Sequence, residues 1–128
     1  MMTQSGNVFG RRRSEPSILL ASDSERHGNT MHRALRQQGF TVEFAGDYGQ
    51  VPALLRDRKF DVVLLEVTGE HAVEPAVAAA LEVKRGNARQ FVAYLADSSL
   101  ETSGLAGDGV MPRSPAKVED ALRRHMRG

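Results

Sequence analysis

Short apolar runs alternate with longer stretches of helical spacing along most of the chain. Continuous runs of apolar and β-branched residues predict buried strands, whereas apolar residues three and four positions apart predict amphipathic helices. Five strands are predicted, over 18–21, 41–45, 62–65, 91–95 and 110–111. Four helices are predicted between and after them, over 25–38, from near 49–51, over 74–84 and from 115 onward.

Residues typical of helix ends stand at the borders of these segments. Ser24 is a candidate N-cap for the first helix, and Gly39 ends that segment. Gly28 lies inside the same helix, where glycine weakens helix formation. Asp47 opens the second helix, with Gln50 three residues later as its capping-box partner.

The alternation of strands and helices predicts an α/β fold, in which a doubly wound parallel sheet carries helices on both faces. In open sheets of this kind, binding sites lie at the carboxyl ends of the strands. The residues that end the apolar runs are therefore the candidates for chemistry. They are Ser22, Asp23, Glu66, Ala96 and Arg113.

Composition indicates one small soluble domain. The chain has 128 residues, of which 41% are hydrophobic, and it has no cysteine, so we expect a single core without disulfides or thiolate metal sites. No apolar run is long enough to span a membrane, and we expect a cytoplasmic protein. The four histidines lack metal-binding spacing, and no nucleophile–base pair is visible, so we expect no enzymatic activity.

Charge separates the first 15 residues from the rest of the chain. The arginines at 11–13 against Glu15 give this segment a charge of +2, which leaves −1 on the remainder. Because the segment is polar and contains few apolar residues, we predict a disordered basic tail over 1–15 and a folded domain over 16–128. Three arginines are weak evidence for nucleic-acid binding, so we expect neither nucleic acid nor a membrane as a partner.

Four segments together resemble the receiver domain of two-component response regulators. The sequence ILLASDSE at 18–25 resembles the motif in which an acidic pair ends the first strand. FDVVLLEV at 60–67 resembles the motif in which the phosphoaccepting aspartate ends the third strand. FVAYLADSS at 91–99 and DGVMPRSPAKVEDAL at 108–122 resemble the fourth strand and the fifth strand with the last helix. The resemblance covers 17 to about 126 and implies a flavodoxin-like sheet with strand order 2-1-3-4-5.

Most of the positions that carry the chemistry of receivers are altered in this chain. The resemblance places Ser22 and Asp23 at the acidic pair, Glu66 at the phosphoacceptor, Ala96 at the hydroxyl position and Arg113 at the lysine position. Only Asp23 keeps the family's residue type. We therefore expect a degenerate receiver that is not phosphorylated in the ordinary way.

Magnesium is the ion that the resemblance implies for this pocket. Asp23, Glu66 and the backbone carbonyl of Thr68 supply three oxygens for it, so we expect a weak or absent Mg²⁺ site and no other cofactor. A sharper hypothesis is that Glu66 pairs with Arg113 and stands in for the phosphorylated state, since a guanidinium suits a carboxylate.

The resemblance implies a stand-alone signalling module that acts on a separate protein. Two alternatives stay open: a receiver that is phosphorylated on Glu66, and a sensor of nucleotides or other small molecules that uses the strand-end pocket. The connection from Ala96 to Arg113 is shorter than receivers usually have and predicts a shortened fourth helix. A homodimer through the fifth strand and the last helix is expected from the resemblance.

Overall fold

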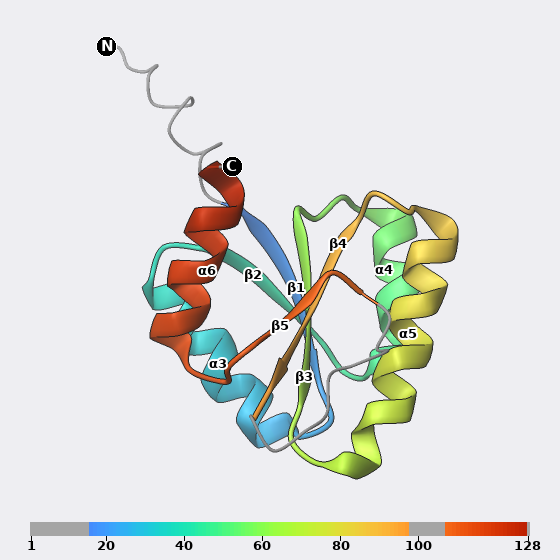
Figure 1. Ribbon diagram of the computed structural model, residues 1–128, viewed down its shortest axis with the longest axis horizontal. Helices are drawn as coiled ribbons and strands as arrows, with labels where there is room; N and C mark the ends of the chain where they lie inside the picture. Colours follow the sequence, from blue (N-terminus) through green and yellow to red (C-terminus); the bar gives the residue numbers. More distant parts are fainter. Residues whose placement is uncertain (1–15, 98–106, 128) are drawn as a thin grey trace.

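The computed structural model describes residues 16–97 and 107–127, in which strands and helices alternate (Figure 1). The strands are β1 (Ser17–Ser22), β2 (Thr41–Ala45), β3 (Val62–Val67), β4 (Phe91–Ala96) and β5 (Gly109–Met111). The helices are α3 (Glu25–Gln37), α4 (Val51–Asp57), α5 (Val73–Gly86) and α6 (Pro115–Arg127), with short 3-10 turns η1 (Tyr48–Gln50) and η2 (Glu70–Ala72). The predicted basic tail (1–15) and the segment expected to hold a shortened fourth helix (98–106) lie outside the described residues.

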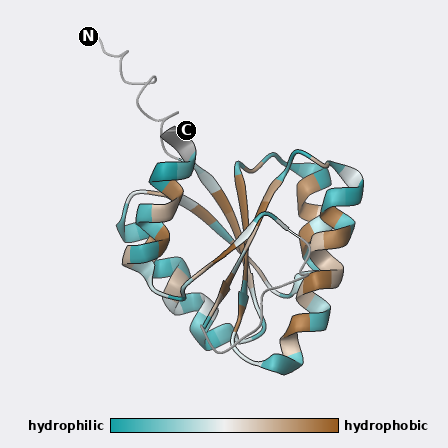
Figure 2. Ribbon diagram, in the orientation of Figure 1, coloured by the Kyte–Doolittle hydropathy of each residue, from teal (hydrophilic) through white to brown (hydrophobic). Residues whose placement is uncertain are grey.

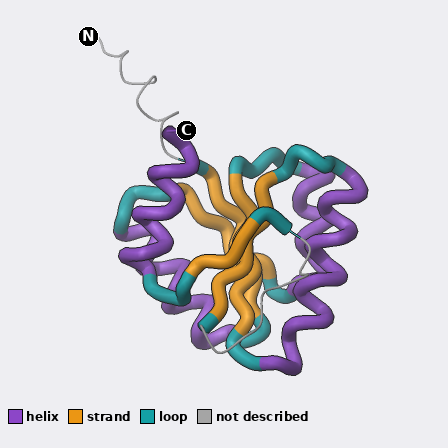
Figure 3. The backbone as a smooth tube through the Cα atoms, in the orientation of Figure 1, coloured by secondary structure: helices purple, strands orange, loops and turns teal. Residues whose placement is uncertain are grey.

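All five strands form one parallel sheet in the order β2-β1-β3-β4-β5. Helices α3 and α6 cover one face of the sheet, and α4 and α5 cover the other (Figures 1 and 3). The predicted doubly wound sheet with strand order 2-1-3-4-5 is therefore confirmed. Because Ser22 pairs with Glu66 and Val67 with Ala96, the carboxyl ends of β1, β3 and β4 meet at one edge.

The sheet separates two apolar layers. Alternate residues of β3 face opposite sides, so that Val63 and Leu65 pack toward α4 and α5, while Val62 and Leu64 pack toward α3 and α6. All six residues of β3 are buried, as expected for a central parallel strand. Figure 2 shows the strands in the middle of the sheet as strongly hydrophobic, with hydrophilic residues on the outer faces of the helices.

Gly28 has a packing role that its helix propensity does not reveal. It is buried in the first turns of α3. A Cβ atom at this position would lie 2.4 Å from Cζ of Phe44 and 3.0 Å from Cβ of Ser22. The glycine thus lets α3 approach the sheet closely, and this approach holds the end of β1 against the helix that follows it.

Ser24 caps α3 as predicted, whereas Asp47, predicted to open the second helix, caps the 3-10 turn η1 that precedes α4. Ser24 accepts a hydrogen bond from the backbone of His27, and Asp47 Oδ1 accepts one from the backbone of Gln50 at 3.1 Å. The capping box at Asp47 is incomplete, because the Gln50 side chain accepts from the backbone of Gly46 instead of that of Asp47. The turn therefore begins at Asp47, as predicted, but the Gln50 side chain binds the backbone one residue earlier than a capping box requires.

Two predicted boundaries were wrong by a few residues. Strand β3 continues past 65 to Val67, because Glu66 and Val67 still pair with β4. Helix α5 begins at Val73 and includes Gly86, whereas the sequence predicted 74–84. Its last turn extends because Asn87 donates a backbone hydrogen bond to Val83 at 2.9 Å. None of the described helices is long and apolar enough to cross a membrane.

A lysine joins the end of α5 to the starts of β4 and β5. Lys84 Nζ donates to the carbonyls of Ala88 and Gln90 at 3.2 and 2.6 Å, and to Oδ2 of Asp108 at 2.7 Å. The same Asp108 oxygen accepts a hydrogen bond from the backbone of Val92 at 2.8 Å. This cluster fixes the position at which the chain enters β5.

Candidate functional site

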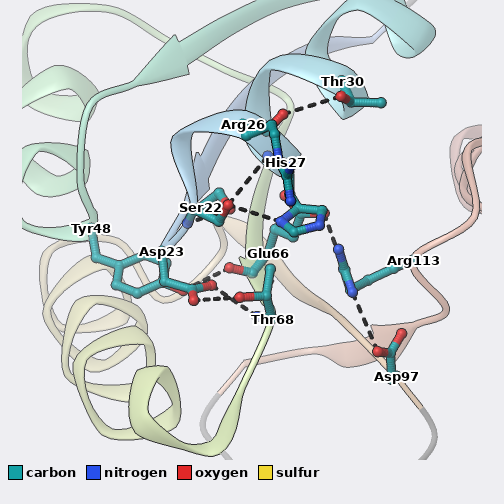
Figure 4. A network of polar contacts seen from close by, with 11 residues as sticks. Ser22, Asp23, Arg26, His27, Thr30, Tyr48, Glu66, Thr68, Asp97 and Arg113 are labelled. Carbon is teal, nitrogen blue, oxygen red and sulfur yellow. Dashed lines mark hydrogen bonds and ion pairs between the residues drawn. The ribbon is translucent and has the colours of Figure 1, made fainter.

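The candidate residues gather at the carboxyl edge of the sheet, and Figure 4 shows all of them except Ala96. Ser22 ends β1, Glu66 lies next to the end of β3, and Ala96 ends β4. Asp23 follows β1 directly, and Arg113 lies between β5 and α6. The topology thus brings together five residues that are up to 91 positions apart in the sequence.

Asp23 is held by a shell of hydrogen-bond donors. Its Oδ1 accepts from the backbone of Thr68 at 2.8 Å, and its Oδ2 accepts from the Thr68 hydroxyl at 2.5 Å. The Tyr48 hydroxyl donates to Oδ1 at 3.4 Å and to the carbonyl of Glu66 at 2.6 Å. His71 Nε2 lies 3.2 Å from Oδ2. Both oxygens of this carboxylate are therefore in use.

Two pKa values in this group are displaced from their ordinary range. Burial alone would raise the pKa of Asp23, but the hydrogen bonds from the Thr68 side chain and backbone outweigh burial and lower it. Burial, together with the negative charge of Asp23, raises the pKa of Tyr48 well above its ordinary value. Asp23 is therefore an anion at neutral pH, and the Tyr48 hydroxyl keeps its proton and acts as a donor.

Glu66 and Arg113 form an ion pair inside the site. Arg113 Nε donates to Oε2 of Glu66 at 3.1 Å, and Arg113 Nη1 donates to Oδ2 of Asp97 at 3.3 Å. The Glu66 side chain is 2% exposed and that of Arg113 is 17% exposed. Within the described residues, the second oxygen of Glu66 is buried without a hydrogen-bond partner. Arg113 is therefore the group that balances the negative charge of the buried Glu66 carboxylate.

The two remaining candidates offer little chemistry to a ligand. Ala96 is buried and ends in a methyl group, so it cannot donate a hydrogen bond. Ser22 is also buried, and its hydroxyl oxygen accepts from the backbone of Ser24 at 3.1 Å. Ser22 therefore stabilises the turn into α3 and adds no negative charge to the site.

The donor set fits a magnesium ion poorly. Mg²⁺ needs nearly ideal octahedral oxygen ligands. Both oxygens of Asp23 accept hydrogen bonds, and one oxygen of Glu66 pairs with Arg113. Thr68 turns its amide and its hydroxyl toward Asp23, and over the described ranges no group of three or more His, Cys, Asp or Glu side chains is placed to hold a metal. We therefore derive no chemical step through Mg²⁺.

The sequence did not single out Tyr48, His71 or Asp97. Tyr48 and His71 reach Asp23 from the turns η1 and η2, and Asp97 reaches Arg113 from the position after β4. Asp97 follows an apolar run directly, so the strand-end rule that selected Ala96 was one residue short of it. The two turns carry no repeating pattern that would have pointed to their residues.

Comparison with known proteins identifies the fold. No protein-family model matches the sequence, and no curated protein sequence matches it. Among solved structures, the chain is similar to the receiver domain of a sensor histidine kinase from Pseudomonas aeruginosa, described with magnesium in its active-site cleft. The TM-score is 0.74 at 17% identity, over 89% of this chain and 99% of the other. The chain has the receiver-domain fold.

Other structures with the receiver fold match over similar lengths. The chemotaxis protein CheY4 of Vibrio cholerae gives a TM-score of 0.70 at 20% identity, over 86% of this chain and 98% of the other. An atypical orphan response regulator, described as having a phosphorylation-independent regulatory mechanism, gives 0.65 at 17% identity, over 87% and 95%. The receiver fold predicted from the four sequence motifs is thus found in the structure.

Proposed function

We propose that this protein is a degenerate receiver that binds a signalling partner without being phosphorylated and without catalysis of its own. The observation that carries the proposal is the ion pair between Arg113 and Glu66. It holds the carboxylate at the phosphoacceptor position, buried and bound to a cation. A similar phosphorylation-independent mode is described for the orphan response regulator with the same fold, and this likeness supports the proposal by analogy.

Transfer of a phosphoryl group to this site meets three obstacles. A nucleophilic carboxylate needs a free oxygen in line with the phosphorus, together with cations that neutralise the phosphoryl oxygens. Glu66 has 1% of its surface exposed, and its Oε2 is already paired. Ala96 supplies no donor for a phosphoryl oxygen, and the Asp23 carboxylate is saturated with hydrogen bonds from Thr68 and Tyr48. These features favour a pocket that is permanently in one state.

The ion pair also suggests which state that is. An anion bound to a cation at this edge of the sheet resembles, in charge and position, a phosphorylated carboxylate paired with a cation. We infer that Glu66 stands in for the phosphorylated form, although it carries about −1 where a phosphoryl group carries about −1.5 to −2. Arg113 also bonds to Asp97, the residue after β4, and so links the Glu66 carboxylate to the end of that strand.

A phosphorylation assay tests the first part of the proposal. The protein is incubated with acetyl phosphate and Mg²⁺, and its intact mass is measured, with the Glu66→Asp variant treated in parallel. We expect no mass gain in the natural sequence. A stoichiometric phosphoryl adduct at Glu66 would instead establish the alternative of a working receiver with a glutamate acceptor. A functional receiver domain in the same reaction confirms that the donor is active.

A partner assay tests the second part. Tagged natural protein captures a partner from the cells that express it, and the affinity is then compared for Glu66→Gln, Glu66→Asp and Arg113→Met. Loss of binding in Glu66→Gln and Arg113→Met is expected if the ion pair sets the binding surface. Arg124→Met removes an exposed arginine whose pair with Asp120 is a surface one, and it serves as the matched control. Equal affinity in all variants would contradict the role of Glu66 as a stand-in.

A further inference from the structure

A cavity of about 400 Å³ lies at the opposite end of the molecule from the candidate site, between α4 and α5. It is lined by the ends of these helices and by residues that lead into β3 and β4. Phe60, which precedes β3, is six residues from Glu66, a separation of about 20 Å along an extended chain. The volume of the cavity is within the range of about 300–1,000 Å³ that is usual for small-ligand sites.

One part of the cavity is apolar. Pro52 and Leu55 of α4 and Val83 of α5 line it together with the ring of Phe60. The guanidinium of Arg58 lies over the Phe60 ring, 5.5 Å from its centre, and also pairs with Glu43. The ring is therefore held in place, and Arg58 is already neutralised by its partner.

The charged lining residues are divided between two walls. Arg56 and Lys59 come from the end of α4 and the segment after it, and neither has an ion-pair partner in the described part of the chain. Glu82 comes from α5, and it too lacks an ion-pair partner among the residues that the structure describes. The cavity thus has a basic wall on the α4 side and an acidic group on the α5 side.

The backbone adds negative potential to the cavity. The C-terminal end of a helix carries about half a negative charge, and its last carbonyls lack partners within the helix, although in α5 the Val83 carbonyl accepts from the backbone of Asn87. Helix α5 ends at Gly86, which lines the cavity beside Asn87. Gln90 also lines the cavity, and its side chain is held in place because its Nε2 donates to the carbonyl of Phe60 at 3.2 Å. Helix α4 also ends at the cavity, at Asp57, so both helix ends favour a cation there, as does Glu82, whereas the side chains of Arg56 and Lys59 favour an anion.

We propose that this cavity binds a small zwitterion with a flat apolar body, the chemistry of an aromatic α-amino acid. The carboxylate would face Arg56 and Lys59, the ammonium group would face Glu82, and the apolar body would lie against Phe60. The inference does not depend on the proposed function, because it concerns residues at the other end of the strands. It assigns the protein a ligand site that is separate from the strand-end pocket.

Backbone NMR titration of the full chain provides the test. The probes are L-phenylalanine, 3-phenylpropionate, which lacks the ammonium group, and phenethylamine, which lacks the carboxylate. We expect saturable shifts at the amides of Phe60, Gly86 and Gln90 with L-phenylalanine, with a dissociation constant of about 1 mM. The other two probes should bind about two- to fivefold more weakly, the effect of one exposed charge pair.

Variants separate the two walls of the cavity. The double variant Arg56→Gln/Lys59→Gln should weaken L-phenylalanine and 3-phenylpropionate by similar factors and leave phenethylamine unchanged. Glu82→Gln should weaken L-phenylalanine and phenethylamine but leave 3-phenylpropionate unchanged. All three side chains are exposed, so these variants should fold. The double variant Arg33→Gln/Arg36→Gln on α3 removes the same charge from exposed positions elsewhere and is the matched control.

Three results would overturn the proposal. The first is an absence of saturable shifts with any probe. The second is equal binding of all three probes, which would indicate an apolar cavity whose charged lining residues do not contribute to recognition. The third is a set of shifts centred on Glu66 and Thr68, which would move the ligand to the strand-end site. A variant designed to fill the cavity gives a further check. A Cβ atom at Gly86 would meet nothing within 4 Å, so we expect Gly86→Phe to fold and to lose binding of L-phenylalanine.

Discussion

Replacing Arg113 with methionine should destabilise the protein more than neutralising its partner Glu66. Arg113→Met leaves a carboxylate that is 2% exposed without its cation, and its second oxygen has no partner in the described residues. Breaking a buried pair in this way costs about 3–5 kcal/mol. Because Arg113 is 17% exposed and water can partly replace it, we expect a value near the lower end, about 3 kcal/mol.

Glu66→Gln should lower the free energy of unfolding much less than Arg113→Met does, and the same contacts give the reason. The amide keeps an oxygen that can accept from Arg113 Nε, and Arg113 retains its bond to Asp97 at 3.3 Å. The expected loss is about 1 kcal/mol, the scale of one weakened hydrogen bond. The central prediction is therefore the ranking: Arg113→Met destabilises the protein more than Glu66→Gln.

Urea unfolding followed by circular dichroism measures the difference. With a slope of about 1.5 kcal/mol/M, Arg113→Met should lower the urea midpoint by about 2 M, and Glu66→Gln by less than about 1 M. Arg124→Met breaks an ion pair whose side chains are 62% and 68% exposed, so it should cost at most about 1 kcal/mol. If Arg113→Met proves no more destabilising than Glu66→Gln, the reasoning from burial is refuted.

Three further variants or conditions test other parts of the structure. Gly28→Ala should lower the free energy of unfolding by about 1–3 kcal/mol, because its methyl group would overlap the ring of Phe44; an unchanged melting temperature would contradict this. The pKa of Asp23 is lowered in the folded state, so its stabilisation is present above the unfolded pKa and lost as the pH falls through the folded value. Thr68→Val should flatten this loss of stability in an acid titration, and an identical pH profile would refute the assignment. Gly107→Ala should cost about 1–2 kcal/mol, since φ is +116° there; hydrogen exchange at β5 measures the effect.

The fold was predictable because its signals are local and repeated. The run of apolar residues over 62–65 identifies the central strand, and the order of such runs identifies a parallel sheet. Glu66 and Arg113 were predicted to meet because both lie where strands end, and parallel strands bring their ends to one edge. The boundaries were less certain, since the length of β3 depends on its pairing with β4.

The surroundings of Asp23 were not predictable in the same way. Tyr48 and His71 reach it from short 3-10 turns, whose positions depend on how the chain packs after each strand. The Thr68 amide and hydroxyl both donate to Asp23, two contacts that the sequence did not predict. They depend on the conformation of one residue outside regular structure, and sequence spacing carries no information about it.

The short strand β5 is held near both of its ends by side chains. Arg113, which follows β5, reaches back to Asp97 at the end of β4, and Lys84 holds Asp108 beside the start of β4. The place of this edge strand in the sheet therefore does not rest on its three residues alone, because contacts on either side of β5 tie it to β4 and α5.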